Sequence, residues 1–227
     1  MKLKQLYIAL FILSSAFGFS QLKTITNKTT YPFWINVPEK ESTEKQPVLI
    51  FLHGKSLSGT DLNRVRRYGV LRAMDKGRKI PAIVVAPQLA KGSWNPDNVL
   101  EVLEYVKKNY NVDESRIYVC GMSLGGYGTL HFAGKYADKI TAAVAICGGG
   151  NVKDGCKLAT IPLWIQHGDK DYIVPVSESQ KVVNAIRKCN EKAKLIFTII
   201  KGGNHGSVEN IFHQDAMYNW LFEQKRE

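Results

Sequence analysis

Short continuous runs of hydrophobic residues recur from residue 31 onward, and stretches with helical spacing separate them. Such runs are typical of strands that are buried on both faces of a sheet. We expect strands over 31–37, 48–52, 82–86, 116–120, 142–146, 163–165 and 195–200. Because helical patterns alternate with these runs, the chain is predicted to form an α/β fold, with a mostly parallel sheet and helices on both faces.

Apolar residues spaced three and four positions apart predict helices between these strands. The expected helices cover about 61–75, 96–106, 126–133 and 182–189, followed by a closing helix that carries Ile211, Phe212 and Trp220. Asn95 and Pro96 mark one helix start, since asparagine caps a helix and proline fits its first turn.

The first twenty residues have a different pattern from the rest of the chain. Two lysines precede an apolar run over 6–13, and small residues follow it. This pattern predicts a secretory signal peptide over 1–20, cleaved after Ser20 or after Gly18. Residues 21–227 are then expected to form a single catalytic domain, secreted or periplasmic, with no stable membrane span after cleavage.

The chain is basic, with a formal net charge of +11. Two of its lysines lie in the first twenty residues. Only Arg64, Arg66 and Arg67 form a small cluster, and the other cations are scattered. A nucleic-acid-binding protein concentrates its positive charge on one face, so no nucleic-acid partner is predicted. Affinity for anionic polymers such as acidic polysaccharide remains an open alternative.

The four cysteines show no metal-ligand spacing, and neither a metal nor another cofactor is predicted. Cys120 and Cys189 fall at apolar positions and are expected to be buried. Cys147 and Cys156 flank a glycine-rich loop, where they could either form a disulfide or stay reduced.

The segment Gly121-Met122-Ser123-Leu124-Gly125 carries the strongest chemical signal. A serine between two glycines, with a strand before and a helix after, is typical of a nucleophile elbow. The glycines are needed because the strand and helix pass close together and the turn is strained. Ser123 is therefore the predicted nucleophile.

A serine hydroxyl needs a base, and the base needs an acid to orient it. His205 lies in a glycine-rich loop after a strand and is the predicted base, whereas His131 and His213 lie within expected helices. The loop over 167–175 follows another strand and offers Asp169 and Asp171 as acids. Asp169 could instead form a turn by accepting backbone N–H bonds.

The tetrahedral intermediate of acyl transfer needs hydrogen-bond donors for its oxyanion. The first predicted donor is the backbone amide of Leu124, at the start of the helix after Ser123. The second is expected from the loop over 52–59, where Gly54 allows the backbone to turn inward and present the amide of Lys55. A plain turn at this place is the alternative.

Together, these motifs resemble the α/β-hydrolase superfamily over about residues 30–222. They comprise Leu52-His53-Gly54, Gly121–Gly126, His167–Pro175 and Asn204-His205-Gly206. The chain is most similar to the compact carboxylesterase, phospholipase and dienelactone hydrolase-like group, which includes secreted feruloyl-esterase-like and depolymerase-like members.

The resemblance implies an α/β-hydrolase fold without a large lid domain. It also implies that Asp171 is the acid and that the amide of Lys55 is the second oxyanion donor. Two departures stand out. Lys55-Ser56-Leu57 follow the first His-Gly pair where relatives often carry more glycines, and the nucleophile is serine rather than the cysteine of dienelactone hydrolases proper.

Two aromatic residues near the expected site are candidate substrate contacts. Trp94 lies in the loop after the strand over 82–86, and Tyr172 adjoins Asp171. Trp94 could stack on a sugar or an aromatic acyl group, or it could simply pack under its loop. With no long insertion to form a lid, an open cleft suited to polar or bulky soluble esters is expected.

The resulting prediction is a secreted serine esterase acting on a small-molecule or carbohydrate-linked ester. A serine peptidase and an acyltransferase would use the same residues and remain alternatives. A catalytically silent carbohydrate-binding protein on this fold is a third. The natural substrate and the oligomeric state are not predicted.

Overall fold

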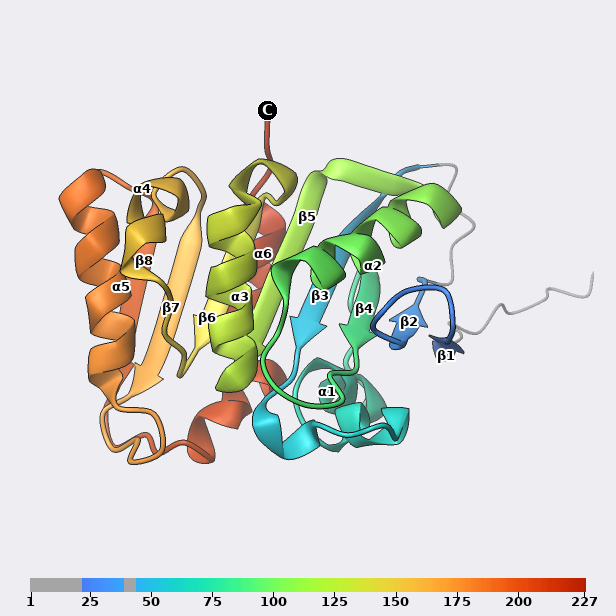
Figure 1. Ribbon diagram of the computed structural model, residues 1–227, viewed down its shortest axis with the longest axis horizontal. Coiled ribbons are helices and arrows are strands. Elements are labelled where there is room, and N and C mark those ends of the chain that lie inside the picture. Colours follow the sequence, from blue (N-terminus) through green and yellow to red (C-terminus); the bar gives the residue numbers. More distant parts are fainter. Residues whose placement is uncertain (1–21, 39–43) are drawn as a thin grey trace, which may run out of the picture.

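The computed structural model describes residues 22–38 and 44–227, which form one eight-stranded sheet and the helices that cover it (Figure 1). Its strands are β1 (Leu22–Ile25), β2 (Phe33–Asn36), β3 (Gln46–Leu52), β4 (Ile83–Pro87), β5 (Val112–Met122), β6 (Ala142–Ile146), β7 (Leu163–Gly168) and β8 (Leu195–Ile200). They are arranged in the order β1-β2-β4-β3-β5-β6-β7-β8. Neighbours from β4 to β8 are parallel, while β2 is antiparallel to β1 and β4, which confirms the predicted mostly parallel sheet. The predicted signal peptide over 1–20 lies outside the described residues.

Helices cover both faces of the sheet, and each face has its own hydrophobic core. The α-helices are α1 (Val70–Asp75), α2 (Pro96–Asn109), α3 (Leu124–Lys135), α4 (Gly155–Leu158), α5 (Val176–Cys189) and α6 (Asp215–Glu223). Short 3₁₀ helices are η1 (Lys55–Leu57), η2 (Leu62–Arg67), η3 (Ala137–Lys139), η4 (Val152–Asp154) and η5 (Ser207–His213). One core lies under α2, α3, α4 and α5, and the other lies under α1, η5 and α6. In the described part of the chain, no helix has both the length and the apolar character to cross a membrane.

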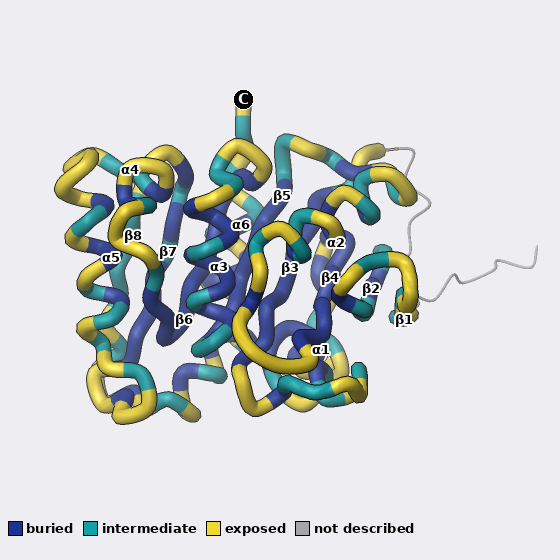
Figure 2. The backbone as a smooth tube through the Cα atoms, in the orientation of Figure 1, coloured by how far each residue is buried: buried dark blue, intermediate teal, exposed yellow. Residues whose placement is uncertain are grey.

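The central strand β3 shows how a continuous apolar run serves both cores. Val48, Ile50 and Leu52 belong to the core under α2 to α5, whereas Leu49 and Phe51 belong to the core under α1 and α6. All five side chains are fully buried, as are β4 and β6 and most of β5 and β7, whereas the edge strands β1 and β8 are partly exposed (Figure 2). Successive side chains of a strand point to opposite faces, so such a run requires two covered faces.

The single helix expected over 61–75 is wrong, because η2 and α1 occupy that range. Gly69 separates them with a φ of 79°, a conformation that favours glycine. A Cβ at this position would also lie 2.2 Å from the Phe51 ring. The helical spacing of apolar residues continues from η2 into α1, so this spacing did not indicate the turn at Gly69.

The closing helix also differs in its start. Ile211 and Phe212 lie on η5, and α6 begins only at Asp215. The start of α2 is confirmed, since the Asn95 side chain accepts a hydrogen bond from the amide of Asp97 and Pro96 opens the helix.

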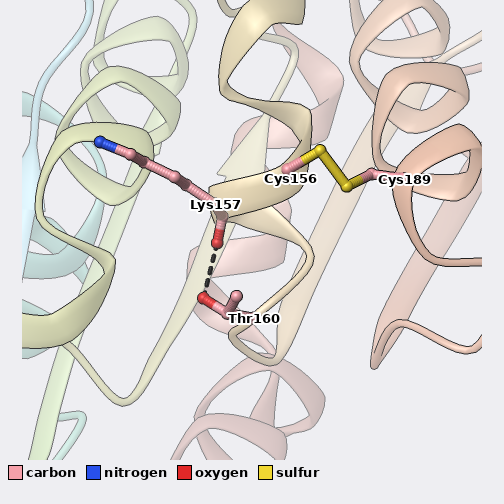
Figure 3. Close-up of a disulfide and its surroundings, with 4 residues drawn as sticks. All are labelled: Cys156, Lys157, Thr160 and Cys189. Atoms are coloured by element: carbon pink, nitrogen blue, oxygen red, sulfur yellow. Dashed lines mark hydrogen bonds between the residues drawn. A yellow bond between two sulfur atoms is a disulfide. The ribbon is translucent and has the colours of Figure 1, made fainter.

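The disulfide is formed by Cys156 and Cys189, whose Cα atoms are 5.1 Å apart. It joins α4 to the last turn of α5 (Figure 3). The possible pairing of Cys147 with Cys156 is therefore wrong, and so is the expectation that Cys189 is a free buried thiol. Cys147 and Cys120 are free and buried, the latter as predicted. The bridge closes a 33-residue separation, and such loops typically stabilise a fold by about 2–4 kcal/mol.

Strand register brings the carboxyl ends of the parallel strands to one edge. Leu52 pairs with Gly121, and Met122 pairs with Ile146. Farther along the sheet, Gly168 pairs with Ile200. The loops that follow β3, β5, β6, β7 and β8 consequently leave the sheet side by side, and they carry the predicted site residues.

Candidate active site

Ser123 lies between β5 and α3 in a strained backbone conformation. Its φ is 59° and its ψ is −123°, and such conformations typically cost about 1–3 kcal/mol in a residue other than glycine. Two backbone bonds hold the turn: the Ser123 N–H donates to the Ile146 carbonyl at 2.9 Å, and its carbonyl accepts from Tyr127 at 3.0 Å. The side chain is thereby presented at the carboxyl edge of the sheet.

The glycines around Ser123 are required by close backbone contact. A Cβ on Gly125 would lie 1.8 Å from the carbonyl oxygen of Leu52, and one on Gly121 would lie 2.7 Å from the same atom. No side chain can be accommodated at such distances. The first turn of α3 therefore rests directly on the end of β3, which places the loop after β3 beside Ser123.

Ser123, His205 and Asp171 form one hydrogen-bonded chain. His205 Nε2 lies 3.0 Å from Ser123 Oγ, and His205 Nδ1 lies 2.7 Å from Asp171 Oδ2. The Asp171 side chain is fully buried, while the His205 side chain is 21% exposed and meets solvent. The structure thus brings His205 together with Asp171, which lies 34 positions before it in the sequence, and with Ser123, which lies 82 positions before it.

Asp169, the alternative acid, has a different contact. Its Oδ1 accepts a hydrogen bond of 2.7 Å from the amide of Gly202, in the loop that carries His205. The Lys170 amide donates to the Gly203 carbonyl at 2.9 Å, which joins the same two loops a second time. Asp169 therefore holds the His205 loop in place, and Asp171 contacts the imidazole.

Four donors surround the Asp171 carboxylate. Burial by itself would raise the pKa of Asp171, but hydrogen bonds outweigh it and hold the pKa below its ordinary value. These donors are the His205 ring, the amide of Val174, the thiol of Cys147 and the amide of Ile173. The two amides both reach Oδ1 at 2.9 Å, which leaves Oδ2 for the imidazole. The carboxylate is kept ionised and fixed in orientation.

The predicted oxyanion donors directly follow Ser123 and Gly54 in the chain. Leu124 is the first residue of α3 and Lys55 is the first residue of η1. Amides at the start of a helix have no acceptor within the helix, so they remain available to a ligand. A Cβ on Gly54 would lie 3.4 Å from the Cβ of Ser123, which shows how near the backbone of this loop approaches the serine.

His53 adjoins this loop but is fully buried and has both ring nitrogens occupied. Nε2 accepts from the Leu89 amide at 3.0 Å, so Nδ1 carries the proton and donates to the Gly54 carbonyl at 2.8 Å. Burial is the main reason that the pKa of His53 falls to about 4, with Arg64 a smaller contribution in the same direction. His53 is therefore neutral and positions the turn at Gly54.

The expectation that Trp94 contacts the substrate is wrong. Its side chain is 4% exposed, and the indole N–H donates to the His53 carbonyl at 3.0 Å. The ring packs edge-on against Tyr31 and His53, and a Cβ on Gly128 would overlap it. A buried tryptophan needs an acceptor for its N–H, and here the backbone supplies one. Trp94 supports the loop from beneath.

Tyr172 lies at the rim of the site and is 84% exposed. Its neighbour Ile173 is 72% exposed, although the Ile173 amide contacts Asp171. Large exposed hydrophobic side chains beside a hydrogen-bonded site are candidate ligand contacts. The substrate role of Tyr172 stays a prediction.

Two residues around Asp171 were not singled out as site residues by the sequence. Cys147 follows β6 with a φ of 46° and donates its thiol to Asp171. His167 is fully buried at the end of β7, where Nε2 lies 3.5 Å from Asp171 Oδ2. Both come at or just after the carboxyl end of a strand, and that position could have identified them.

Cys147, His167 and Asp171 place potential metal-ligand atoms within 4.8 Å of one another. The His167 nitrogens are already occupied, with Nδ1 2.7 Å from Ser179 Oγ and Nε2 2.8 Å from the Val174 carbonyl. The Asp171 oxygens are engaged as described above. These bonds use the atoms that a cation would need, so the group serves to hold Asp171 and we assign no metal to it.

The comparisons with known proteins agree with this geometry. Residues 95–218 match the model of a family described as Phospholipase/Carboxylesterase. A bifunctional acetylxylan esterase/xylanase of Neocallimastix patriciarum is 35% identical over 85 residues, which are 37% of this chain and 12% of that protein. A probable feruloyl esterase C of Aspergillus terreus is 28% identical over 162 residues, 66% of this chain and 58% of that protein. The matches thus span only part of these relatives.

Solved structures extend the likeness over most of the chain. A thermostable esterase superposes with a TM-score of 0.79 at 30% identity, covering 90% of this chain and 63% of that one. S-formylglutathione hydrolase of Staphylococcus aureus has a TM-score of 0.69 at 17% identity, covering 90% and 97%, and at this identity it supports the fold alone.

Proposed function

The chain belongs to the phospholipase/carboxylesterase family of α/β-hydrolases, and from the geometry around Ser123 we propose that it is an exported serine esterase. The observation that carries the proposal is the hydrogen-bonded chain from Ser123 through His205 to Asp171. A hydroxyl, an imidazole and an ionised carboxylate in this order are the components of nucleophilic acyl transfer.

In the proposed reaction, Ser123 Oγ attacks the ester carbonyl carbon while His205 Nε2 takes the hydroxyl proton. Asp171 accepts the Nδ1–H of His205 and stabilises the imidazolium that forms. The carbonyl oxygen becomes an oxyanion, which the amides of Leu124 and Lys55 stabilise. His205 then gives its proton to the departing alcohol, and an acyl-enzyme remains on Ser123.

Water completes the cycle by the same route. His205 removes a proton from the water as it attacks the acyl carbon, and it returns that proton to Ser123 Oγ when the acid leaves. The partial exposure of the His205 side chain supports this step, because water can reach the imidazole. The burial of Asp171 supports the orientation of the ring in both halves.

We propose that the substrate is an ester carried by a small molecule or a carbohydrate. The names of the similar proteins include an acetylxylan esterase, a poly(3-hydroxyalkanoate) depolymerase and a feruloyl esterase. Exposed Tyr172 and Ile173 give the rim an apolar face that suits an aryl or acyl group. Comparing acetyl, feruloyl and short acyl esters with peptide substrates would separate an esterase from a peptidase.

Export is proposed on two grounds. The pattern over 1–20 is that of a signal peptide, and the disulfide between Cys156 and Cys189 is typical of oxidising compartments. N-terminal sequencing of the protein recovered outside the cytoplasm should begin at Gln21 or Phe19. Recovery with Met1 still attached would contradict cleavage.

The central test is hydrolysis of p-nitrophenyl acetate by Ser123→Ala. The rate should fall by about 10⁴-fold or more, and any remaining rate above the uncatalysed reaction should come from substrate binding and the oxyanion donors alone. Ser177→Ala, which removes an exposed hydroxyl from α5, is the matched control and should keep full activity. Undiminished turnover by Ser123→Ala would overturn the proposal. A fluorophosphonate should label the native protein and not this variant.

A further inference from the structure

A large cavity lies at the edge of the sheet opposite Ser123. Its volume is about 1100 Å³, and it is lined by the segments that precede β6, β7 and β8, by α4 and by the last residues of the chain. In Figure 1 the strand arrows point away from α4 and from the C-terminal end, which places this cavity at the amino ends of the strands. The Ser123, Asp171 and His205 loops lie at the carboxyl ends.

The length of the strands separates the two places. β7 has six residues, and at about 3.3 Å per residue it spans roughly 20 Å. A ligand in the cavity would therefore not reach Ser123 through the sheet. Whatever the cavity binds is bound independently of the proposed reaction.

The cavity is strongly basic. Six of its lining residues are Lys or Arg, and only Asp138 and Glu227 are acidic. Two of the cations have internal partners: Lys135 pairs with Asp97 at 2.5 Å, and Arg226 donates to backbone carbonyls. No ion pair within the described ranges involves the other four, which are Lys157, Lys192, Lys194 and Lys225.

Like charges gathered around one cavity repel one another unless a ligand or counterions neutralise them. Here the backbone that carries them is fixed. The disulfide joins α4 to α5, and the Lys157 carbonyl accepts from Thr160 Oγ1 at 2.7 Å (Figure 3). The Lys194 carbonyl accepts from the Leu163 amide at 2.9 Å. The Arg226 amide binds the Ser115 carbonyl at 3.0 Å and fixes the end of the chain. A ligand would meet charges carried on a fixed backbone, so no ordering of the main chain adds to the cost of binding.

We propose that this cavity binds a segment of an anionic polysaccharide, whose carboxylate or sulfate groups pair with Lys157, Lys192, Lys194 and Lys225. The site would hold the enzyme on a polymer while Ser123, at the other edge, acts on esters. It goes beyond the proposed function, because binding needs neither the hydrolysis nor the residues that perform it.

The composition of the walls favours this ligand over other polyanions. None of the described residues that line the cavity is aromatic, so the bases of a single-stranded nucleic acid would find no stacking surface. None of the large exposed hydrophobic side chains in the described part of the chain lines it, so it has no apolar anchor for a membrane. Lysine ammonium groups act as adaptable point charges, which suits anionic groups spaced along a flexible sugar chain.

The test measures binding of the Ser123→Ala protein to polygalacturonate and to dextran sulfate, with neutral dextran as the blank. Polygalacturonate reports carboxylates and dextran sulfate reports sulfates. The cavity variant replaces Lys157, Lys192, Lys194 and Lys225 by Gln. The matched control replaces the exposed Lys28, Lys79, Lys91 and Lys108 by Gln, so that both variants lose the same charge.

The parent protein should bind at least one of the two anionic polymers and should not bind dextran. The cavity variant should bind about tenfold more weakly or worse, and the control should stay within about twofold, because the interaction is local rather than a response to net charge. In an otherwise native background, both variants should hydrolyse p-nitrophenyl acetate at the native rate.

Equal weakening in both variants would overturn the proposal, since it would show attraction to net charge alone. Failure of the parent protein to bind either polymer would overturn it too. So would binding of single-stranded DNA or of phosphatidylserine vesicles at this cavity as tight as that of the polysaccharides. Loss of esterase activity in Ser123→Ala is read separately, so the proposed function and this inference can fail independently.

Discussion

His53 and His205 both follow a parallel strand at the same edge of the sheet, yet their surroundings differ in every respect that matters for catalysis. His205 is partly exposed and joins a hydroxyl to an ionised carboxylate. His53 is fully buried and joins two backbone groups, the Leu89 amide and the Gly54 carbonyl. The His205 imidazole contacts a hydroxyl and meets solvent, and the His53 imidazole is held in a single neutral form.

The comparison shows that a position after a parallel strand does not by itself make a histidine available for proton transfer. What distinguishes the two is burial, together with the groups on the ring nitrogens. The charged form of a fully buried ring is disfavoured, and the His53 nitrogen that would take a second proton already accepts the Leu89 amide. Burial outweighs the Gly54 carbonyl, which by itself would raise the pKa, and the pKa of His53 falls to about 4.

The largest expected effect comes from removing the imidazole at position 205. His205→Gln should lower kcat for p-nitrophenyl acetate by about 10⁴-fold or more, because Ser123 loses its base. His131→Gln, in α3, removes an imidazole that lies outside the hydrogen-bonded chain and should leave kcat unchanged. If His205→Gln kept a tenth of native activity, another base would have to be sought.

Changing the partner of His205 should have the next largest effect. Asp171→Asn places an amide against Nδ1, which favours the wrong tautomer, and kcat should fall by about 10³–10⁴-fold. Asp169→Asn is the matched control. Its amide oxygen can still accept from the Gly202 amide, so kcat should change by less than about tenfold. A greater loss in Asp169→Asn than in Asp171→Asn would reverse the assignment of the acid.

The smallest effect concerns stability at acid pH. In the folded protein the pKa of His53 is about 4, against 6.5 when unfolded, so the unfolded chain takes up the proton first as pH falls. The contribution of neutral His53 to the free energy of unfolding is fully present above pH 6.5. It is lost as the pH falls towards 4, and the loss amounts to about 3 kcal/mol.

Urea denaturation at pH 7 and pH 4 measures this loss. His53→Gln cannot titrate, so its free energy of unfolding should fall less over this interval than that of the native protein. His131→Gln should keep the native pH dependence. Asp171 also has a lowered pKa and adds a loss at more acid pH, but it is present in all three proteins and cancels in the comparison. Identical slopes for native protein and His53→Gln would contradict the assignment of a neutral His53.

Most of the sheet could be predicted because its strands are continuous apolar runs. β6 and β8 have the bounds that their sequences indicated. The break at Gly69 could not be predicted, since it depends on the Phe51 ring, which packs against that turn from a distant strand. Periodicity records which face of a helix is buried, and it does not record which neighbour interrupts the helix.

For the site, the order of the motifs predicted Ser123, His205 and an acid in the loop over 167–175, because parallel strands deliver their following loops to one edge. The preference for Asp171 over Asp169 came from the family resemblance. The burial of Trp94 and the pairing of Cys156 could not be predicted, because both depend on contacts between residues that are far apart in the sequence. The indole needed an acceptor, which the His53 carbonyl supplies. Cys156 pairs with Cys189, 33 positions away, although Cys147 is nearer in the sequence, because α4 and the last turn of α5 come together only in the fold.

The close contact between Gly125 and the end of β3 has a consequence for how such an enzyme can diversify. A Cβ on Gly125 would lie 1.8 Å from the Leu52 carbonyl oxygen, so no other residue can replace this glycine without moving the backbone. The exposed rim residues Tyr172 and Ile173 bear no such constraint. Substitutions at the rim can therefore be accommodated by this fold, whereas a side chain at Gly125 would force β3 and α3 apart and displace Ser123.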